Sequence, residues 1–168
     1  MKDEIIPIAY LISNIVAVIM LACSWKYPRI ARLLYLFLFA WASLANSHAA
    51  LKTPQYYLDY ERFAFIGFYR NFIHGFFSEH ITALVLIVAL CQIAIAVSML
   101  LKGWIYRTGC LGAILFLVSI APLGVGSGFP CTLIMAAGLL LLLRKKEVDY
   151  LWKEFRINQS NEESTEVL

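Results

Sequence analysis

The chain has 168 residues, of which 61% are hydrophobic and 15% are charged, and its formal net charge at pH 7 is +3. Soluble globular domains are closer to half apolar and a quarter charged, so this composition excludes an ordinary soluble domain and predicts an integral membrane protein. The small positive charge does not indicate nucleic acid as a partner, because no basic soluble surface is left to carry it.

Five apolar stretches are long enough, or nearly so, to cross the hydrocarbon core of a bilayer, which takes about 20 helical residues. They predict an all-α fold, a polytopic membrane bundle of five transmembrane helices, with residues 1–146 forming the membrane domain. The first stretch follows two acidic residues and is too long for a signal peptide, so we expect it to be retained as a helix. The five predicted spans are residues 5–23, 33–51, 81–101, 105–123 and 124–143. In the last of them the uncharged, glycine-rich stretch LGVGSGFP is expected to form a short turn before the apolar helix CTLIMAAGLLLLL.

The segment 52–80, between the second and third spans, is too polar to cross a membrane and is crowded with aromatic residues. We expect one or two short helices lying in the membrane interface, broken near Gly67 or Gly75. Ser78 would then be the N-cap of the third span. After the last span, residues 147–168 begin as a basic amphipathic stretch and continue as a polar tail that we expect to be disordered.

The lysines and arginines predict the orientation, because they collect on the cytoplasmic side of membrane proteins. Five spans place most of them on one side, so we expect the N-terminus outside, the C-terminus in the cytoplasm, and a bacterial inner membrane as the location. The majority side carries Lys26, Arg29, Arg32, Lys102, Arg107, Arg144, Lys145, Lys146, Lys153 and Arg156, and the other side carries Lys2, Lys52, Arg62 and Arg70.

A candidate ligand-binding pocket lies at the predicted outer face, where all three histidines fall close to the aromatic segment. Imidazole is a common metal ligand, but His74 and His80 are six residues apart and do not share a helical face, so we predict no metal site. A pocket for a quinone, a lipid or haem stays open beside a purely structural role, and no single cofactor is indicated. The candidate residues are Asn46, His48, Tyr60, Arg70, His74, Glu79 and His80.

Polar residues inside the spans favour helix–helix contacts over catalysis. Asn46 and Ser47 lie three and four residues after Ser43, so they share a face of the second span with it and can hydrogen-bond a neighbouring helix. Gln92, near the middle of the third span, is a possible link of the same kind. No Ser/His/Asp or Cys/His arrangement indicates a nucleophile.

Three features carry a family resemblance. An arginine-led helix, RIARLLYLFLFAWASLANSHAALKTPQYYLDY, ends in small and polar residues before a Lys-x-Pro and aromatic stretch; the span ITALVLIVALCQIAIAVSMLLKGW follows, and two closely connected spans complete the pattern. In these features residues 29–146 resemble the DoxX-like family of small membrane proteins. The resemblance implies a four-helix core, to which the first span would be an addition, and association with thiosulfate–quinone oxidation or other redox complexes. The family is functionally heterogeneous, so its fold alone does not fix an activity.

These observations lead to three hypotheses of function. The first is a non-catalytic accessory subunit of a redox or cell-envelope membrane complex, whose partners are the lipid bilayer and a membrane protein or a second copy of the chain. The second is an outward-facing pocket protein or enzyme acting on a quinone, a lipid or haem. The third is a small transporter, which the absence of charged residues in the middle of the spans disfavours. We expect the first span to be peripheral, because it has few small or polar residues for close packing.

Overall fold

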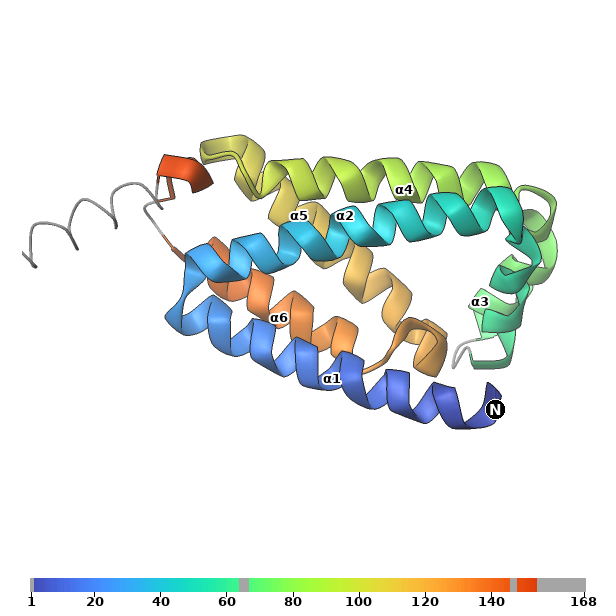
Figure 1. The fold of residues 1–168 in the computed structure, drawn as a ribbon. Coiled ribbons are helices and arrows are strands. Elements are labelled where there is room, and N and C mark those ends of the chain that lie inside the picture. The colour runs from blue at the N-terminus through green and yellow to red at the C-terminus, as the bar shows by residue number, and fades with distance from the viewer. Residues whose placement is uncertain (1, 64–66, 146–147, 154–168) are drawn as a thin grey trace, which may run out of the picture.

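The computed structural model describes residues 2–63, 67–145 and 148–153, and over these residues it contains helices and no strands. Its long helices form a bundle, and short helical turns connect the second long helix to the third and the fourth to the fifth (Figure 1). The prediction of an all-helical bundle is therefore confirmed. The long helices are α1 (Lys2–Lys26), α2 (Pro28–Lys52), α4 (Ile81–Ser98), α5 (Gly103–Ile120) and α6 (Cys131–Leu143), and the short ones are η1 (Pro54–Phe63), α3 (Gly67–Phe72), η2 (Ile73–Phe77) and η3 (Ala121–Ser127).

Three segments of the described chain are long and apolar enough to cross a membrane: α2, α4, and Gly103–Gly124, which contains α5. The apolar parts of α1 and α6 are shorter. α6 begins at Cys131 rather than at residue 124, because η3 and a turn precede it, and in this connection Gly124 and Gly128 have φ of 67° and 76°. Side chains rarely tolerate such positive φ angles, so the glycines end the helical path. The count of five spans thus stays a prediction.

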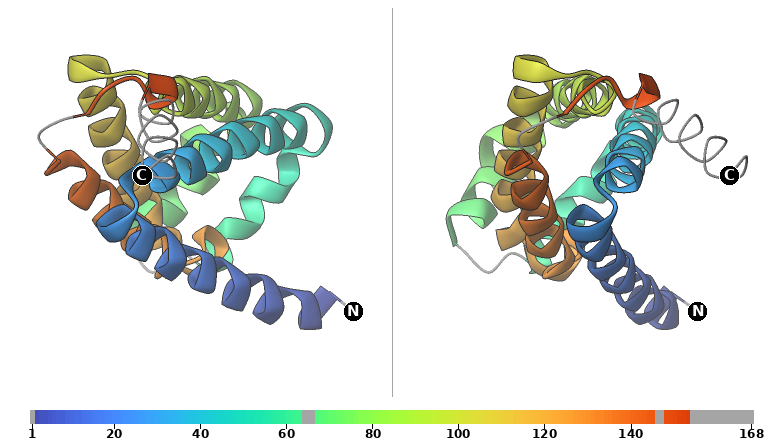
Figure 2. Two further views of the ribbon diagram at one scale, coloured as in Figure 1. Left: turned by 60° about the vertical axis from the view of Figure 1, so that its left-hand side comes forward. Right: turned by 90° about the vertical axis from the view of Figure 1, so that its left-hand side faces the viewer.

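The main contacts between long helices form a ring (Figure 2). In it α1 packs on α2, α2 on α4, α4 on α5, α5 on α6, and α6 back on α1. Side chains from these helices meet in one apolar core, which includes Met20 of α1, Phe39 of α2, Met99 after α4, Cys110 of α5 and Leu139 of α6. The sequence predicts a peripheral first span with limited close packing; in the structure α1 exposes many of its large apolar side chains, yet it packs on α6 and α2 and so closes this ring.

Small residues allow the helices to approach one another closely where α1, α2 and α6 meet. Gly138 of α6 faces the side chains of Ser24 and Tyr35, so a Cβ placed on it would overlap the Tyr35 hydroxyl and lie 3.0 Å from Ser24 Oγ. Both hydroxyls make hydrogen bonds here. Ser24 donates to the Met20 carbonyl within α1 at 2.8 Å, and Tyr35 donates to the Met135 carbonyl of α6 at 2.7 Å. Close approach between small residues is a principal way for helices to associate in lipid.

The α1–α2 turn, the α4–α5 turn and the end of α6 lie together at one end of the bundle, on the left in Figure 1. Lys145 Nζ donates to the Trp25 carbonyl at 3.5 Å, and the backbone N–H of Leu151 donates to the Leu100 carbonyl at 3.1 Å. Residues 148–153 cross this end, with Leu151 buried. The cations counted above for the cytoplasmic side therefore gather at this basic end, except for Lys146 and Arg156, which lie outside the described residues.

At the opposite end, the turns that join α2 to α4 fold across the bundle. η1 contacts η3, and the Tyr69 hydroxyl of α3 donates to the Ser119 carbonyl of α5 at 2.5 Å. The helical path breaks at Gly75, whose φ and ψ are −91° and −114°, as the sequence indicated. The predicted tail falls in residues 154–168, outside the described residues.

Replacing Gly138 by alanine tests the close packing of α6. We expect Gly138→Ala to destabilise the protein by about 1–3 kcal/mol, because the new methyl group forces apart well-packed helices. Gly112→Ala is a matched control, since a Cβ at Gly112 of α5 meets nothing within 4 Å. Thermal unfolding of the two variants in the same detergent provides the measurement, and equal melting temperatures would contradict the packing described here.

Candidate functional site

Asn46, the first of the predicted site residues, links three parts of the fold. Its Nδ2 donates to Gln92 Oε1 of α4 at 2.9 Å, and its Oδ1 accepts a hydrogen bond from the Tyr57 hydroxyl of η1 at 2.9 Å. One turn earlier on α2, Ser43 Oγ donates to the Ala89 carbonyl at 2.7 Å. Gln92 is 3% exposed, so this polar link lies inside the α2–α4 interface. The arrangement matches the interhelical role considered for these side chains.

The histidines of the predicted outer face do not share a metal site in the structure. His48, His74 and His80, with Glu79, are all exposed. The His80 ring stacks on Phe76 with centroids 4.7 Å apart, and its Nδ1 lies 3.1 Å from the Phe76 carbonyl oxygen. Within the described ranges, no group of three His, Cys, Asp or Glu side chains is placed to hold a metal ion.

The entry to α4 differs from the prediction. Ser78 Oγ is engaged with the carbonyls of His74 and Gly75, at 2.8 and 2.7 Å, and so closes the preceding turn. α4 follows His80, which makes no side-chain cap hydrogen bond. The N-cap prediction for Ser78 is wrong, because carbonyls freed at the Gly75 kink lie within reach of its hydroxyl. The side chains of Tyr60 and Arg70, the remaining predicted site residues, lie outside the described part of the structure.

The basic end contains a group of side chains centred on Arg32, which is 1% exposed. Its Nε donates to the Met99 carbonyl at 3.0 Å and its Nη2 to the Leu101 carbonyl at 2.7 Å, both at the end of α4. Its Nη1 donates to the Asp149 carbonyl at 2.9 Å. The guanidinium carbon lies 4.7 Å from the centroid of the Tyr106 ring of α5. One side chain of α2 therefore connects α4, α5 and the segment after α6.

The chemistry of these contacts suits arginine. The last carbonyls of a helix have no partners within the helix and carry the negative end of its dipole, so a cation with several N–H groups stabilises them. The planar guanidinium can address three carbonyls at once and stack on an aromatic ring, which a lysine cannot do. Arg32 thus supplies hydrogen-bond donors to backbone carbonyls at the end of α4 and in the turn after it, which would otherwise lack them.

A second charged contact holds the segment after α6. Lys102 Nζ lies 3.2 Å from the Asp149 carboxylate and 4.8 Å from the centroid of the Tyr150 ring. The backbone N–H of Tyr150 and then Lys102 lower the pKa of Asp149, so this carboxylate stays ionised at neutral pH. Both charged side chains are well exposed, and such pairs add little stability. Their effect is to fix the position of the Asp149 backbone, whose carbonyl receives Arg32.

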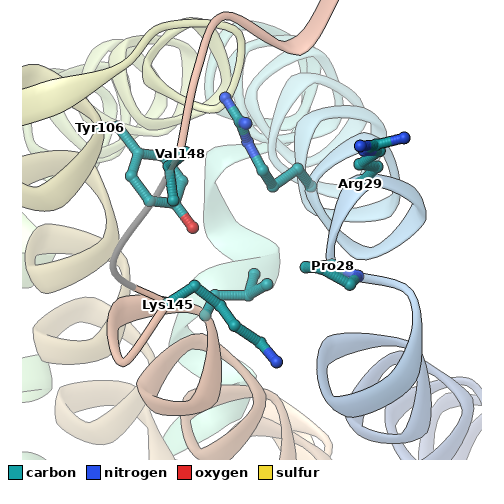
Figure 3. Close-up of a pocket in the computed structure, with 7 residues that line it drawn as sticks. Pro28, Arg29, Tyr106, Lys145 and Val148 are labelled. Carbon is teal, nitrogen blue, oxygen red and sulfur yellow. The ribbon is translucent and has the colours of Figure 1, made fainter. Parts of the chain in front are cut away.

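A cavity of about 160 Å³ lies beside Arg32. Figure 3 shows Tyr106, Lys145 and Val148 across this cavity from Pro28 and Arg29. The lining joins the start of α2, the first turn of α5 and the end of α6. Its described lining residues include three cations and no acid, and they are Pro28, Arg29, Arg32, Tyr106, Leu142, Lys145 and Val148.

The sequence did not single out this group as a site. Arg29, Arg32 and Lys145 entered the prediction only as cations that set the orientation. One signal was available: Arg32 shares a helical face with Tyr35, Phe39 and Ser43, all of which are buried. A cation on the apolar face of a membrane helix is costly unless the fold supplies partners, so this position indicates a buried arginine.

The chain was compared with family models, with curated proteins and with solved structures, and none of them matches it. The resemblance to the DoxX-like family therefore rests on the sequence features given above.

Replacing Arg32 tests whether this side chain holds the basic end together. We expect Arg32→Met to destabilise the protein by about 3 kcal/mol or more, because one buried and two partly buried carbonyls lose their donors. Arg32→Lys should recover only part of this loss, since lysine keeps the charge but lacks the planar set of N–H donors of the guanidinium. Arg107→Met, an exposed position in the same end of α5, is the control and should change stability by less than about 0.5 kcal/mol. Thermal unfolding in detergent is the measurement, and equal effects of Arg32→Met and Arg107→Met would refute the role of Arg32.

Proposed function

We propose that this chain is an integral membrane protein that crosses the bilayer five times, with its N-terminus outside and its C-terminus in the cytoplasm. Large apolar side chains exposed on the outer faces of all five long helices carry this proposal. A soluble monomer rarely exposes apolar patches beyond a few hundred Å². α1 and α6, whose apolar parts are shorter, share this property with α2, α4 and α5. Examples are Val16 and Ile19 on α1, Trp41 and Leu44 on α2, Ile87 and Leu90 on α4, Leu111 and Leu115 on α5, and Leu133 and Leu140 on α6.

The length of α6 is compatible with a span. Its 13 residues rise about 20 Å, which is less than the roughly 30 Å of the hydrocarbon core. The preceding residues 121–130 contain no charged side chain, so this connection can enter the membrane together with the helix. A modest local thinning of the bilayer accommodates the remaining difference.

Aromatic residues at the basic end support the proposed orientation. Trp25, Tyr27, Trp104 and Trp152 are exposed there, beside the cations. Tryptophan and tyrosine favour the level of the lipid headgroups, and cations favour the cytoplasmic side. Both preferences are met when the basic end lies at the cytoplasmic surface.

Cysteine labelling on the two sides of α2 tests the proposed orientation. In a background without the four native cysteines, we expect Gln55→Cys, in η1, to react in intact cells with a thiol reagent that does not cross membranes. Lys26→Cys, at the last residue of α1, should react only after the cells are opened. Both positions are exposed, so access is decided by the membrane and not by the fold. Labelling of Lys26→Cys from outside would contradict the proposal.

The role we propose is that of a non-catalytic accessory subunit of a redox or cell-envelope membrane complex. The resemblance to the DoxX-like family supports it. The polar contacts between α2 and α4 also support it, because Ser43, Asn46 and Gln92 are used to join helices. The apolar outer faces provide surface for a partner helix as well as for lipid.

Purification from native membranes tests this role. In a mild detergent we expect the tagged chain to elute in a complex with a fixed stoichiometry. Any visible absorption of a redox cofactor should then come from the partner protein and not from this chain. Deleting the chain should then lower the abundance or activity of that partner. A chain that purifies alone with bound quinone or haem would refute the accessory role and favour an outward-facing pocket protein.

A further inference from the structure

We propose that the cavity beside Arg32 is a binding site for a phosphate group, carried by an anionic lipid or present as free phosphate. The cavity lies at the basic end, between the start of α2, the first turn of α5 and the end of α6. This site is separate from the predicted outer-face residues, which lie at the other end of the bundle.

The size of the cavity suits a small anion. Its volume of about 160 Å³ is several times the roughly 30 Å³ that a water molecule occupies in the liquid. Pockets for whole drug-sized ligands measure about 300–1,000 Å³, so a complete quinone or haem is too large for it. A phosphate group fits, and an attached lipid tail would have to leave the cavity toward the membrane.

The start of α2 has a charge arrangement that an anion would complete. Arg29 stands in its first turn and Arg32 follows directly after it; that turn contains no acidic residue, and Tyr27 makes no side-chain cap hydrogen bond. The N-terminus of a helix carries the positive end of the dipole, so cations there are unfavourable and anions are favoured. A phosphate group bound beside Arg29 would lie at this favourable end of the helix.

The three basic side chains of the cavity differ in how firmly the fold holds them. Arg32 is buried and held by the carbonyls of Met99, Leu101 and Asp149, so its charge is positioned before any ligand arrives. Lys145 is exposed, and Arg29 is partly exposed, so both can adjust to a ligand that enters from the surface. Arginine pairs with phosphate through two parallel N–H bonds, whereas lysine binds it as a point charge.

The position of the site also suits a lipid headgroup. Exposed Trp25 and Trp104 lie at the same end, at positions typical of headgroup depth. Basic pockets between membrane helices on the cytoplasmic side bind anionic headgroups. The proposal about the phosphate group itself does not depend on the number of spans.

Native mass spectrometry of the purified full-length protein tests the lipid form of the ligand. We expect bound phosphatidylglycerol to exceed bound phosphatidylcholine at equal concentration. Arg29→Gln and Lys145→Gln should each weaken the phosphatidylglycerol affinity about fivefold. Lys145→Arg should keep it, and Arg107→Gln, which removes a charge from the same end outside the cavity, should leave it unchanged. A melting temperature equal to that of the wild type shows that each variant is folded.

A second titration, with sodium phosphate against sodium chloride at equal ionic strength, tests the free anion. A rise in melting temperature for the wild type and Arg107→Gln, but not for Arg29→Gln or Lys145→Gln, supports a free phosphate as the ligand even if lipid binding is unchanged. If all the variants bind phosphatidylglycerol like the wild type and phosphate raises none of their melting temperatures, the site does not exist. Labelling of Lys26→Cys reports on the membrane orientation alone, so a failure of the proposed orientation can be distinguished from a failure of the phosphate site.

Discussion

The basic end of the bundle depends on one buried cation. A charged arginine removed from water costs several kcal/mol unless its N–H groups find partners, and here it receives three backbone carbonyls and an aromatic ring. The contact also stabilises the end of α4, because the last carbonyls of a helix have no N–H partner within that helix. Arg32 therefore sets the register of α2 against α4 and holds residues 148–153 across the same end. The cavity beside it exists because these elements meet around a fixed side chain.

The rest of the bundle is held by short polar links between apolar helices. Asn46 with Gln92, Ser43 with the Ala89 carbonyl and Tyr35 with the Met135 carbonyl each join two helices inside the ring. In lipid the apolar surfaces gain little from one another, since the acyl chains are equally apolar, so close packing and such hydrogen bonds determine which faces meet. This explains why the polar residues of α2 lie on the buried face.

The sequence predicted the helical class, the break at Gly75 and the gathering of the cations at one end, because hydropathy, glycine and charge act locally. It did not predict that α1 closes the ring, because that contact depends on Gly138, a small residue more than 100 positions away from it in the chain. The glycines of residues 123–130 also predicted the turn before the last helix, and α6 begins directly after it, at Cys131. For the site, composition identified the cations, but only the three-dimensional arrangement distinguishes Arg32 from those on the surface.

The ring has a consequence for the order in which the protein is made. α1 is synthesised first, and its neighbour α6 is the last long helix of the described chain to follow. Until α6 packs against it, the face of α1 that carries Ala17, Met20 and Ser24 has only α2 beside it. Contacts between segments far apart in a chain form late, because the intervening chain must first be ordered. During synthesis this face is therefore open to other molecules, and a ribosome stalled before α6 would leave it available to helices of other proteins.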